Sequence, residues 1–220
     1  MTTTDTTAPE MTAPEMTDTR PLFTRSLALA SHTIGAVRAD QLDRPTPCHE
    51  MTVELLVAHL VSVVDRLAVV GAGGDPFGVP DYAEGDGPDR WQVVFDASVA
   101  KAQVVWSDDA VLARMLKLPW AELPGFIALP IYINELSVHT WDLATATDQS
   151  PEWDDEVLAA GYDAIQIGLP AEGRVESFDA VRDSMPEGYQ NFTPPFAAAV
   201  TVSDDAPLIE KLVGWNGRQP

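Results

Sequence analysis

Most of the chain consists of segments in which apolar residues recur at intervals of three and four, separated by clusters of proline or glycine. This spacing is typical of helices that bury one face against a shared core. It predicts helices at about residues 21–37, 52–70, 89–106, 107–117, 125–147, 151–167 and 203–214. The sequence therefore favours a mainly α protein built around a helical bundle.

Three regions differ in composition and suggest how the chain is organised. Residues 1–20 contain the segment TAPEM twice among threonines and acids, so we expect a disordered acidic tail, or alternatively a docking peptide. Residues 21–170 hold the long helical patterns of the bundle. Residues 171–220 are expected to form a small α+β appendage packed on the bundle, with a strand at 197–202.

Local signals place the ends of several helices. Thr52 is a plausible N-cap for the second helix, which we expect to stop at the glycines of 71–74. Ser150 followed by Pro151 resembles the start of the 151–167 helix. Pro130 falls within the long helical pattern, where proline either kinks a helix or occupies its first turn.

The charge of the chain excludes some classes of partner. Its 220 residues include 13 Lys and Arg against 34 Asp and Glu, a net charge of −21. Nucleic-acid binding requires cations that neutralise phosphates, and docking on an anionic membrane surface meets the same obstacle. No apolar stretch approaches the roughly 20 residues of a membrane span. We expect a cytoplasmic protein, monomeric or homodimeric, because its one cysteine forms no internal disulfide and no leader pattern follows Met1.

A polar stripe in the 125–147 helix is the first candidate site. Glu135 and His139 are four residues apart and lie on one helical face, and Asp142 continues that face. Apolar residues border the stripe on both sides, so we expect it to point into the bundle. A buried carboxylate needs a partner, and a divalent metal is a strong one.

His59 lies in a similar apolar stripe of the second helix, and we expect it to be buried. Two imidazoles and a carboxylate from facing helices match an open zinc-type site with room for water or substrate. The alternative is that the histidines are hydrogen-bonded core residues and that the Glu135–His139 pair is a modest helix contact. For Asp142, orienting a ligand imidazole competes with satisfying a neighbouring backbone or tryptophan N–H.

Other chemistry-bearing residues are less informative. Cys48 precedes a helix, where the helix dipole favours a thiolate, but packing of the loop beneath the bundle is the simpler interpretation. His32 and His49 have no spacing that recruits them as ligands. The long glycine-rich loop at 71–90 is expected to border the site. No phosphate-binding or nucleophile-elbow motif is present.

Two segments resemble the signatures of a known family. Thr46-Pro47-Cys48 with Met51–Leu60, and Glu135–Ala144, are similar to the signature segments of the mycothiol-dependent maleylpyruvate isomerase-like proteins, which have a DinB-like bundle. The closing Gly217–Pro220 resembles the end of an actinobacterial subgroup. Where this chain has Met51, the first signature usually has tryptophan.

The resemblance implies a DinB-like four-helix bundle that holds a divalent metal, most readily zinc, through His59, Glu135 and His139. It also implies mycothiol as a cofactor and an electrophilic small-molecule substrate. The activated thiolate would add to the double bond of maleylpyruvate, allow rotation and leave as fumarylpyruvate, or else the thiol would be transferred to an electrophile. The alternative is a non-catalytic metal-binding bundle that serves regulation or protein binding.

Overall fold

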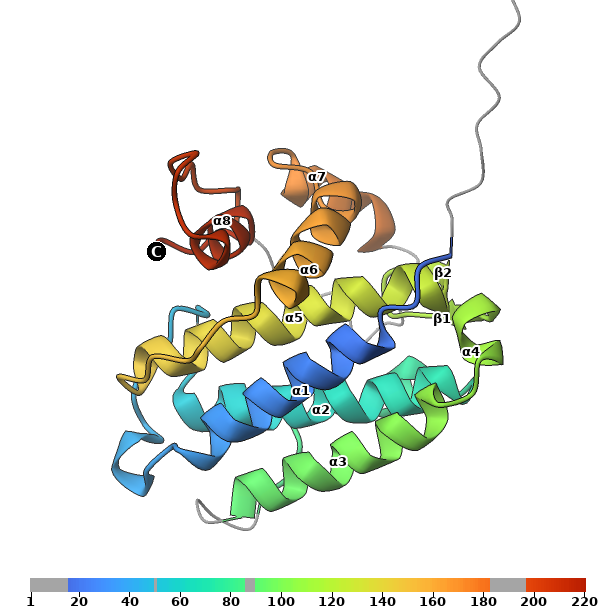
Figure 1. Ribbon diagram of the computed structural model, residues 1–220, viewed down its shortest axis with the longest axis horizontal. Helices are drawn as coiled ribbons and strands as arrows, with labels where there is room; N and C mark the ends of the chain where they lie inside the picture. The colour runs from blue at the N-terminus through green and yellow to red at the C-terminus, as the bar shows by residue number, and fades with distance from the viewer. Residues whose placement is uncertain (1–15, 50, 86–89, 183–196) are drawn as a thin grey trace, which may run out of the picture.

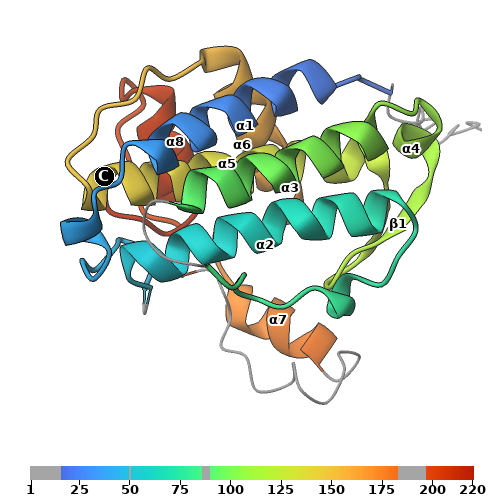
Figure 2. The ribbon, with the colours of Figure 1, turned by 90° about the horizontal axis from the view of Figure 1, so that it is seen from below.

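The computed structural model describes residues 16–49, 51–85, 90–182 and 197–220 and is mainly helical. Four long helices form the bundle (Figure 1), namely α1 (Arg20–Gly35), α2 (Val53–Gly71), α3 (Trp91–Trp106) and α5 (Gly125–Ala146). Helix α1 packs against α3 and α5, and α2 packs against the same two helices from the other side, as Figure 2 shows from below. The predicted helical bundle is confirmed.

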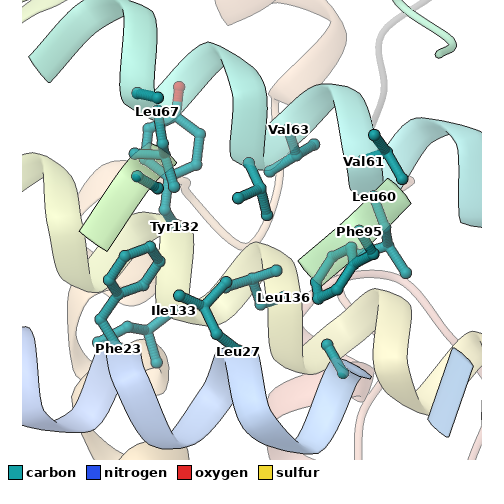
Figure 3. Close-up of a cluster of buried hydrophobic side chains, with 14 of the residues drawn as sticks. Phe23, Leu27, Leu60, Val61, Val63, Leu67, Phe95, Tyr132, Ile133 and Leu136 are labelled. Carbon is teal, nitrogen blue, oxygen red and sulfur yellow. The ribbon is translucent and has the colours of Figure 1, made fainter. Parts of the chain in front are cut away.

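The core of this bundle is built from the apolar stripes that the sequence contains. Phe23 and Leu27 of α1 meet Leu60 of α2, Phe95 of α3 and Ile133 of α5 (Figure 3), and all five are almost fully buried. Each such side chain contributes about 1.5–3 kcal/mol when it leaves water. Packing of these stripes therefore fixes how α2 and α5 face each other.

The predicted N-cap and end of the second helix are both present. The Thr52 hydroxyl accepts a hydrogen bond from the Leu55 N–H, and the chain then runs as α2 to Gly71. Gly73, two residues beyond the helix end, has a φ of 83°, the left-handed region that glycine adopts at low cost, and this conformation terminates α2. A short 3₁₀ turn, η1 (Ala39–Gln41), joins α1 to the segment before α2, and a second one, η2 (Pro76–Gly78), follows α2.

The helix expected at 107–117 is wrong over its second half. Helix α4 covers only Ala110–Ala113, and β1 (Met115–Lys117) then pairs antiparallel with β2 (Glu122–Pro124). The Leu118 N–H donates to the Ala121 carbonyl at 2.8 Å and closes the hairpin. Leu116 is buried between two exposed neighbours, and this alternation suits a strand.

Helix α6 (Asp155–Gly168) begins four residues later than the Ser150–Pro151 signal predicted. The Asp154 carboxylate caps it by accepting hydrogen bonds from the Glu156 and Val157 N–H groups. Arg25 of α1 forms salt bridges to Asp154 and Glu156 at 2.7 and 2.6 Å. The salt bridges from α1 thus favour Asp154 as the N-cap over the Ser150–Pro151 signal, which is equally good locally.

The described C-terminal segment is helical and contains no strand. Helix α7 (Arg174–Arg182), which the sequence did not predict, is followed after the undescribed residues by an irregular stretch and α8 (Leu208–Trp215). The strand expected at 197–202 is wrong, because the Val200 N–H donates to the Gly214 carbonyl of α8 and not to a neighbouring strand. The last helix also starts late, after Pro207 and not at 203.

Residues 1–15 of the predicted tail lie outside the described part of the chain, and α1 begins at Arg20. Pro130 lies inside α5, beyond its first turn. Among the described residues, no helix is both long and apolar enough to cross a membrane.

Arg174 fixes the C-terminal segment. Its guanidinium is buried and donates to the carbonyls of Pro170, Ala197 and Trp215, which belong to three separate stretches of chain. Helix α8 packs in turn on α6 and α5 around Leu158, Leu212 and Val213. One side chain therefore links three separate stretches of backbone through hydrogen bonds.

Replacing Arg174 with glutamine should lower the free energy of unfolding by about 3 kcal/mol, because three carbonyls lose their hydrogen bonds to a charged donor. Urea denaturation measures this change. Arg38→Gln is the matched control, because Arg38 is exposed and its salt bridge to Asp40 contributes little. Equal stability of the two variants would contradict the role given to Arg174.

Candidate metal centre

The polar stripe of α5 faces α2, and three of the sequence-predicted residues meet there. His139 Nε2 lies 3.3 Å from Glu135 Oε1, and His59 Nε2 of α2 lies 3.4 Å from the same oxygen. The two imidazole rings stand edge to face with centroids 5.0 Å apart. One ligand atom from each of the three residues falls within 4.8 Å of the others.

These separations fit a metal centre better than a hydrogen-bonded trio. Hydrogen bonds between an imidazolium and a carboxylate are usually about 2.7–2.9 Å long. Two ligand atoms in a tetrahedral zinc site, each roughly 2.0–2.1 Å from the ion, lie about 3.3–3.4 Å apart. The chemistry of the donors, two imidazoles and a carboxylate, also suits a catalytic zinc site with an open position.

The three side chains differ in their exposed fractions. His139 is 8% exposed, whereas His59 and Glu135 are 18% and 24% exposed. The expectation that His59 is buried holds only in part, because the ring lies at the edge of the interface between α2 and α5. Partial exposure of two of the three candidate ligands leaves one side of the candidate centre accessible from solvent.

The charges of the centre stabilise each other. Burial alone would raise the pKa of Glu135, but the two neighbouring imidazoles hold it well below its usual range. Burial alone would lower the pKa of His139, but the Glu135 carboxylate and the hydrogen bond that His139 donates to Asp142 raise it well above the usual value. Both shifts in pKa favour the charged forms, a Glu135 carboxylate beside a protonated His139.

Asp142 lies behind His139, on the side of the ring away from Glu135. Its Oδ2 accepts a hydrogen bond from His139 Nδ1 at 3.0 Å, and the side chain is fully buried. Burial would raise the pKa of Asp142, but the hydrogen bonds from His139 and Arg218 hold it below its usual range. This geometry favours the orienting role over a contact with a tryptophan or backbone N–H.

A second group of possible ligands shares His139 with the first. Cys48, His139 and Asp142 also place ligand atoms within 4.8 Å of one another. Arg218 donates two hydrogen bonds to Asp142 there, which supplies the positive charge that a cation would otherwise bring. The candidate metal centre is therefore the group formed by His59, Glu135 and His139.

The sequence did not place Cys48 beside His139 and Asp142, although packing of Cys48 against the bundle core agrees with the simpler interpretation. His32 and His49 belong to neither group of possible ligands in the described chain. Arg218 was missed as a contributor to the site, because it is 76 residues from Asp142 and no local spacing connects them.

The loop after α2 borders the centre, as the sequence predicted. The Tyr82 ring lies 6.3 Å from the His59 ring, and the Ala83 N–H donates to the Ala58 carbonyl. Arg66 of α2 holds the loop by donating to the carbonyls of Pro76 and Val79. The described part of this loop is residues 71–85, and residues 86–89 lie outside it.

A helical bundle in which two imidazoles and a carboxylate converge from facing helices defines the molecule as a candidate metal-binding bundle. Residues 23–144 match the family model of the mycothiol maleylpyruvate isomerase N-terminal domain. This match covers more than half of the chain, so the protein belongs to that family, and the resemblance seen in the sequence is confirmed.

Two relatives are uncharacterised proteins of Mycobacterium tuberculosis, one from each of two strains. Each is 28% identical over 182 residues, which covers 83% of this chain and 87% of the relative. The crystal structure of the mycothiol-dependent maleylpyruvate isomerase matches with a TM-score of 0.55 and 14% identity. The match covers 71% of this chain and 69% of that one, and it shows a shared fold.

Metal binding should weaken as the pH falls. Because the pKa of His139 is raised without metal, the ion must displace a proton from Nε2, and this competition grows as the pH drops below that pKa. Calorimetric titration with zinc in two buffers of different ionisation enthalpy should show release of about one proton per ion near neutral pH. Binding without proton release would contradict the assignment of His139 as a ligand.

Proposed function

We propose that the protein is an enzyme that depends on a divalent metal, with zinc the best match, and on a low-molecular-weight thiol. The observation that supports this proposal is the convergence of His59 Nε2, His139 Nε2 and Glu135 Oε1 at ligand-like separations beside solvent. Membership of the mycothiol maleylpyruvate isomerase N-terminal domain family makes mycothiol the thiol to test first.

Each residue of the candidate centre has a separate role in this proposal. His59 and His139 would hold the metal as neutral ligands, and Glu135 would add one negative charge. Asp142 keeps the His139 ring in place and keeps the hydrogen on Nδ1. A bound divalent metal lowers the pKa of a coordinated thiol, which makes it a nucleophilic thiolate at neutral pH.

Two reactions fit a thiolate at this position. One is isomerisation of an activated double bond, as the name of the structurally similar isomerase indicates for that protein. The other is transfer of the thiol to an electrophile. In both cases, the partly exposed side of Glu135 and His59 is where a small electrophile would approach.

The alternative is a metal-binding bundle with a regulatory or protein-binding role. A metal that only supports the structure of such a bundle is usually closed off by four protein ligands. The exposed fractions of 18% and 24% at His59 and Glu135 favour the enzyme.

The metal content of the purified protein tests the site. After zinc supplementation and desalting, wild type should retain about one ion per chain, whereas His59→Ala and Glu135→Ala should not. His32→Ala is the matched control, because His32 lies on α1 in the groove facing α3, and it should retain the ion. A wild type that retains no ion, or ligand variants that retain it fully, would contradict the proposal.

Use of a thiol is tested separately. Adding mycothiol to the cobalt-substituted protein should produce a thiolate-to-cobalt charge-transfer absorption band, because the open position would accept the sulfur. Incubation with mycothiol and maleylpyruvate then distinguishes isomerisation from transfer. A metal-loaded protein that shows no such band would contradict thiol dependence while leaving the metal centre intact.

A further inference from the structure

The C-terminal end of the chain returns to the metal centre through a tightly specified turn. Helix α8 ends in a Schellman motif, in which the Gly217 N–H donates to the Gly214 carbonyl and the Arg218 N–H to the Val213 carbonyl. Gly217 has a φ of 80°, and a Cβ there would lie 2.9 Å from the Ala197 Cβ. A glycine is therefore required, and the turn sends Arg218 toward α5.

A pair of buried amides fixes this turn on α5. Asn216 donates to Asn134 Oδ1 at 2.8 Å, and Asn134 donates back to Asn216 Oδ1 at 3.2 Å. Asn134 is the residue before Glu135. Figures 1 and 2 show α8 and the C-terminus alongside the later half of α5. The end of the chain is thus positioned relative to the ligands.

Arg218 completes a chain of contacts to His139. Its Nε donates to Asp142 Oδ1 at 3.2 Å, its Nη2 donates to Asp142 Oδ2 at 2.9 Å, and its Nη1 donates to the Asn216 carbonyl. Asp142 is fully buried and Arg218 is 8% exposed. The same Oδ2 accepts the hydrogen bond from His139 Nδ1.

We propose that Arg218 is a positioning residue for the ligand His139 and that it acts through Asp142. This inference rests on the proposed metal centre. The planar guanidinium fixes both oxygens of Asp142, so that the carboxylate accepts three hydrogen bonds and donates none. His139 must then carry a hydrogen on Nδ1, so that Nε2, once it has lost its proton to a competing metal, directs its lone pair toward Glu135 and His59. Residues 216–218 thereby belong to the metal centre.

Arg218 and the candidate ligands belong to different parts of the chain. The residue lies outside the 23–144 segment that matches the family model, whereas His59, Glu135, His139 and Asp142 all lie inside it. The matched domain therefore supplies the candidate ligands, whereas Arg218, which positions one of them, comes from the C-terminal segment. A purely structural arginine would instead stabilise the fold without changing the ligands.

A double-mutant cycle separates these two roles, with the zinc dissociation constant measured by chelator competition. Arg218→Gln and Asp142→Asn should each weaken zinc binding by about 10-fold or more, as is usual for partners that orient a ligand. Because Arg218 acts through Asp142, the double variant should bind no more weakly than Asp142→Asn alone. Independent, additive losses would overturn the proposal.

Arg174→Gln is the matched control, because Arg174 is another buried arginine of the same segment, and within the described part of the chain its hydrogen bonds all go to backbone carbonyls. It should bind zinc as wild type does at a temperature where it is folded. Ligand-field absorption of the cobalt-substituted protein should change in Arg218→Gln and not in Arg174→Gln. Equal spectra in both variants and wild type would overturn the proposal.

Arg218→Lys covers the case in which Arg218→Gln does not fold. Lysine keeps the charge but cannot fix both carboxylate oxygens, so zinc binding should be intermediate. Wild-type affinity in Arg218→Lys would overturn the role of the guanidinium. If wild type binds no zinc, the metal centre itself is overturned. If wild type binds zinc and the Arg218 variants bind it equally well, only this inference is overturned.

Discussion

Two imidazoles contact one carboxylate at the interface of two facing helices, where all three are partly removed from water. The rest of the structure matters to the site because it holds these two helices in place. Glu135 and His139 come from α5 and His59 from α2, so their separations depend on how these two helices pack. The packing is fixed by large apolar side chains such as Leu60 and Ile133. A loosened core would therefore act on the site as directly as the loss of a ligand would.

The two ring nitrogens of His139 have different partners. Its Nε2 faces Glu135, and its Nδ1 faces Asp142, which Arg218 holds from the C-terminal segment. Support of this kind has a general physical reason, because an imidazole ligand is useful only in one tautomer and one orientation. The C-terminal segment thus has a reason to be packed on the bundle besides covering apolar surface.

The sequence predicted the bundle and the three candidate ligands because both depend on helical periodicity, a local property. Glu135 and His139 share a face through their spacing alone, and Thr52 caps α2 as its hydroxyl and position suggest. The family resemblance, confirmed by the match over residues 23–144, linked them to His59, which no spacing could do.

The predictions that were wrong depended on contacts between distant segments. The start of α6 is selected by Arg25, and Val200 finds its hydrogen-bond acceptor in α8 and not in a strand. Arg218 was missed for the same reason, since its role exists only once α8 is packed on α5. The β1–β2 hairpin is an exception, because its contacts are local, but each strand has only three residues, too few to show an alternating apolar pattern.

X-ray absorption spectroscopy of the zinc-loaded protein tests the central claim most directly. If His59, Glu135 and His139 hold the ion, the absorption fine structure should show only nitrogen and oxygen neighbours at about 2.0–2.1 Å, with the scattering pattern of two imidazoles. A sulfur neighbour at about 2.3 Å would place the ion beside Cys48 and contradict the account. Failure to retain zinc would contradict it equally.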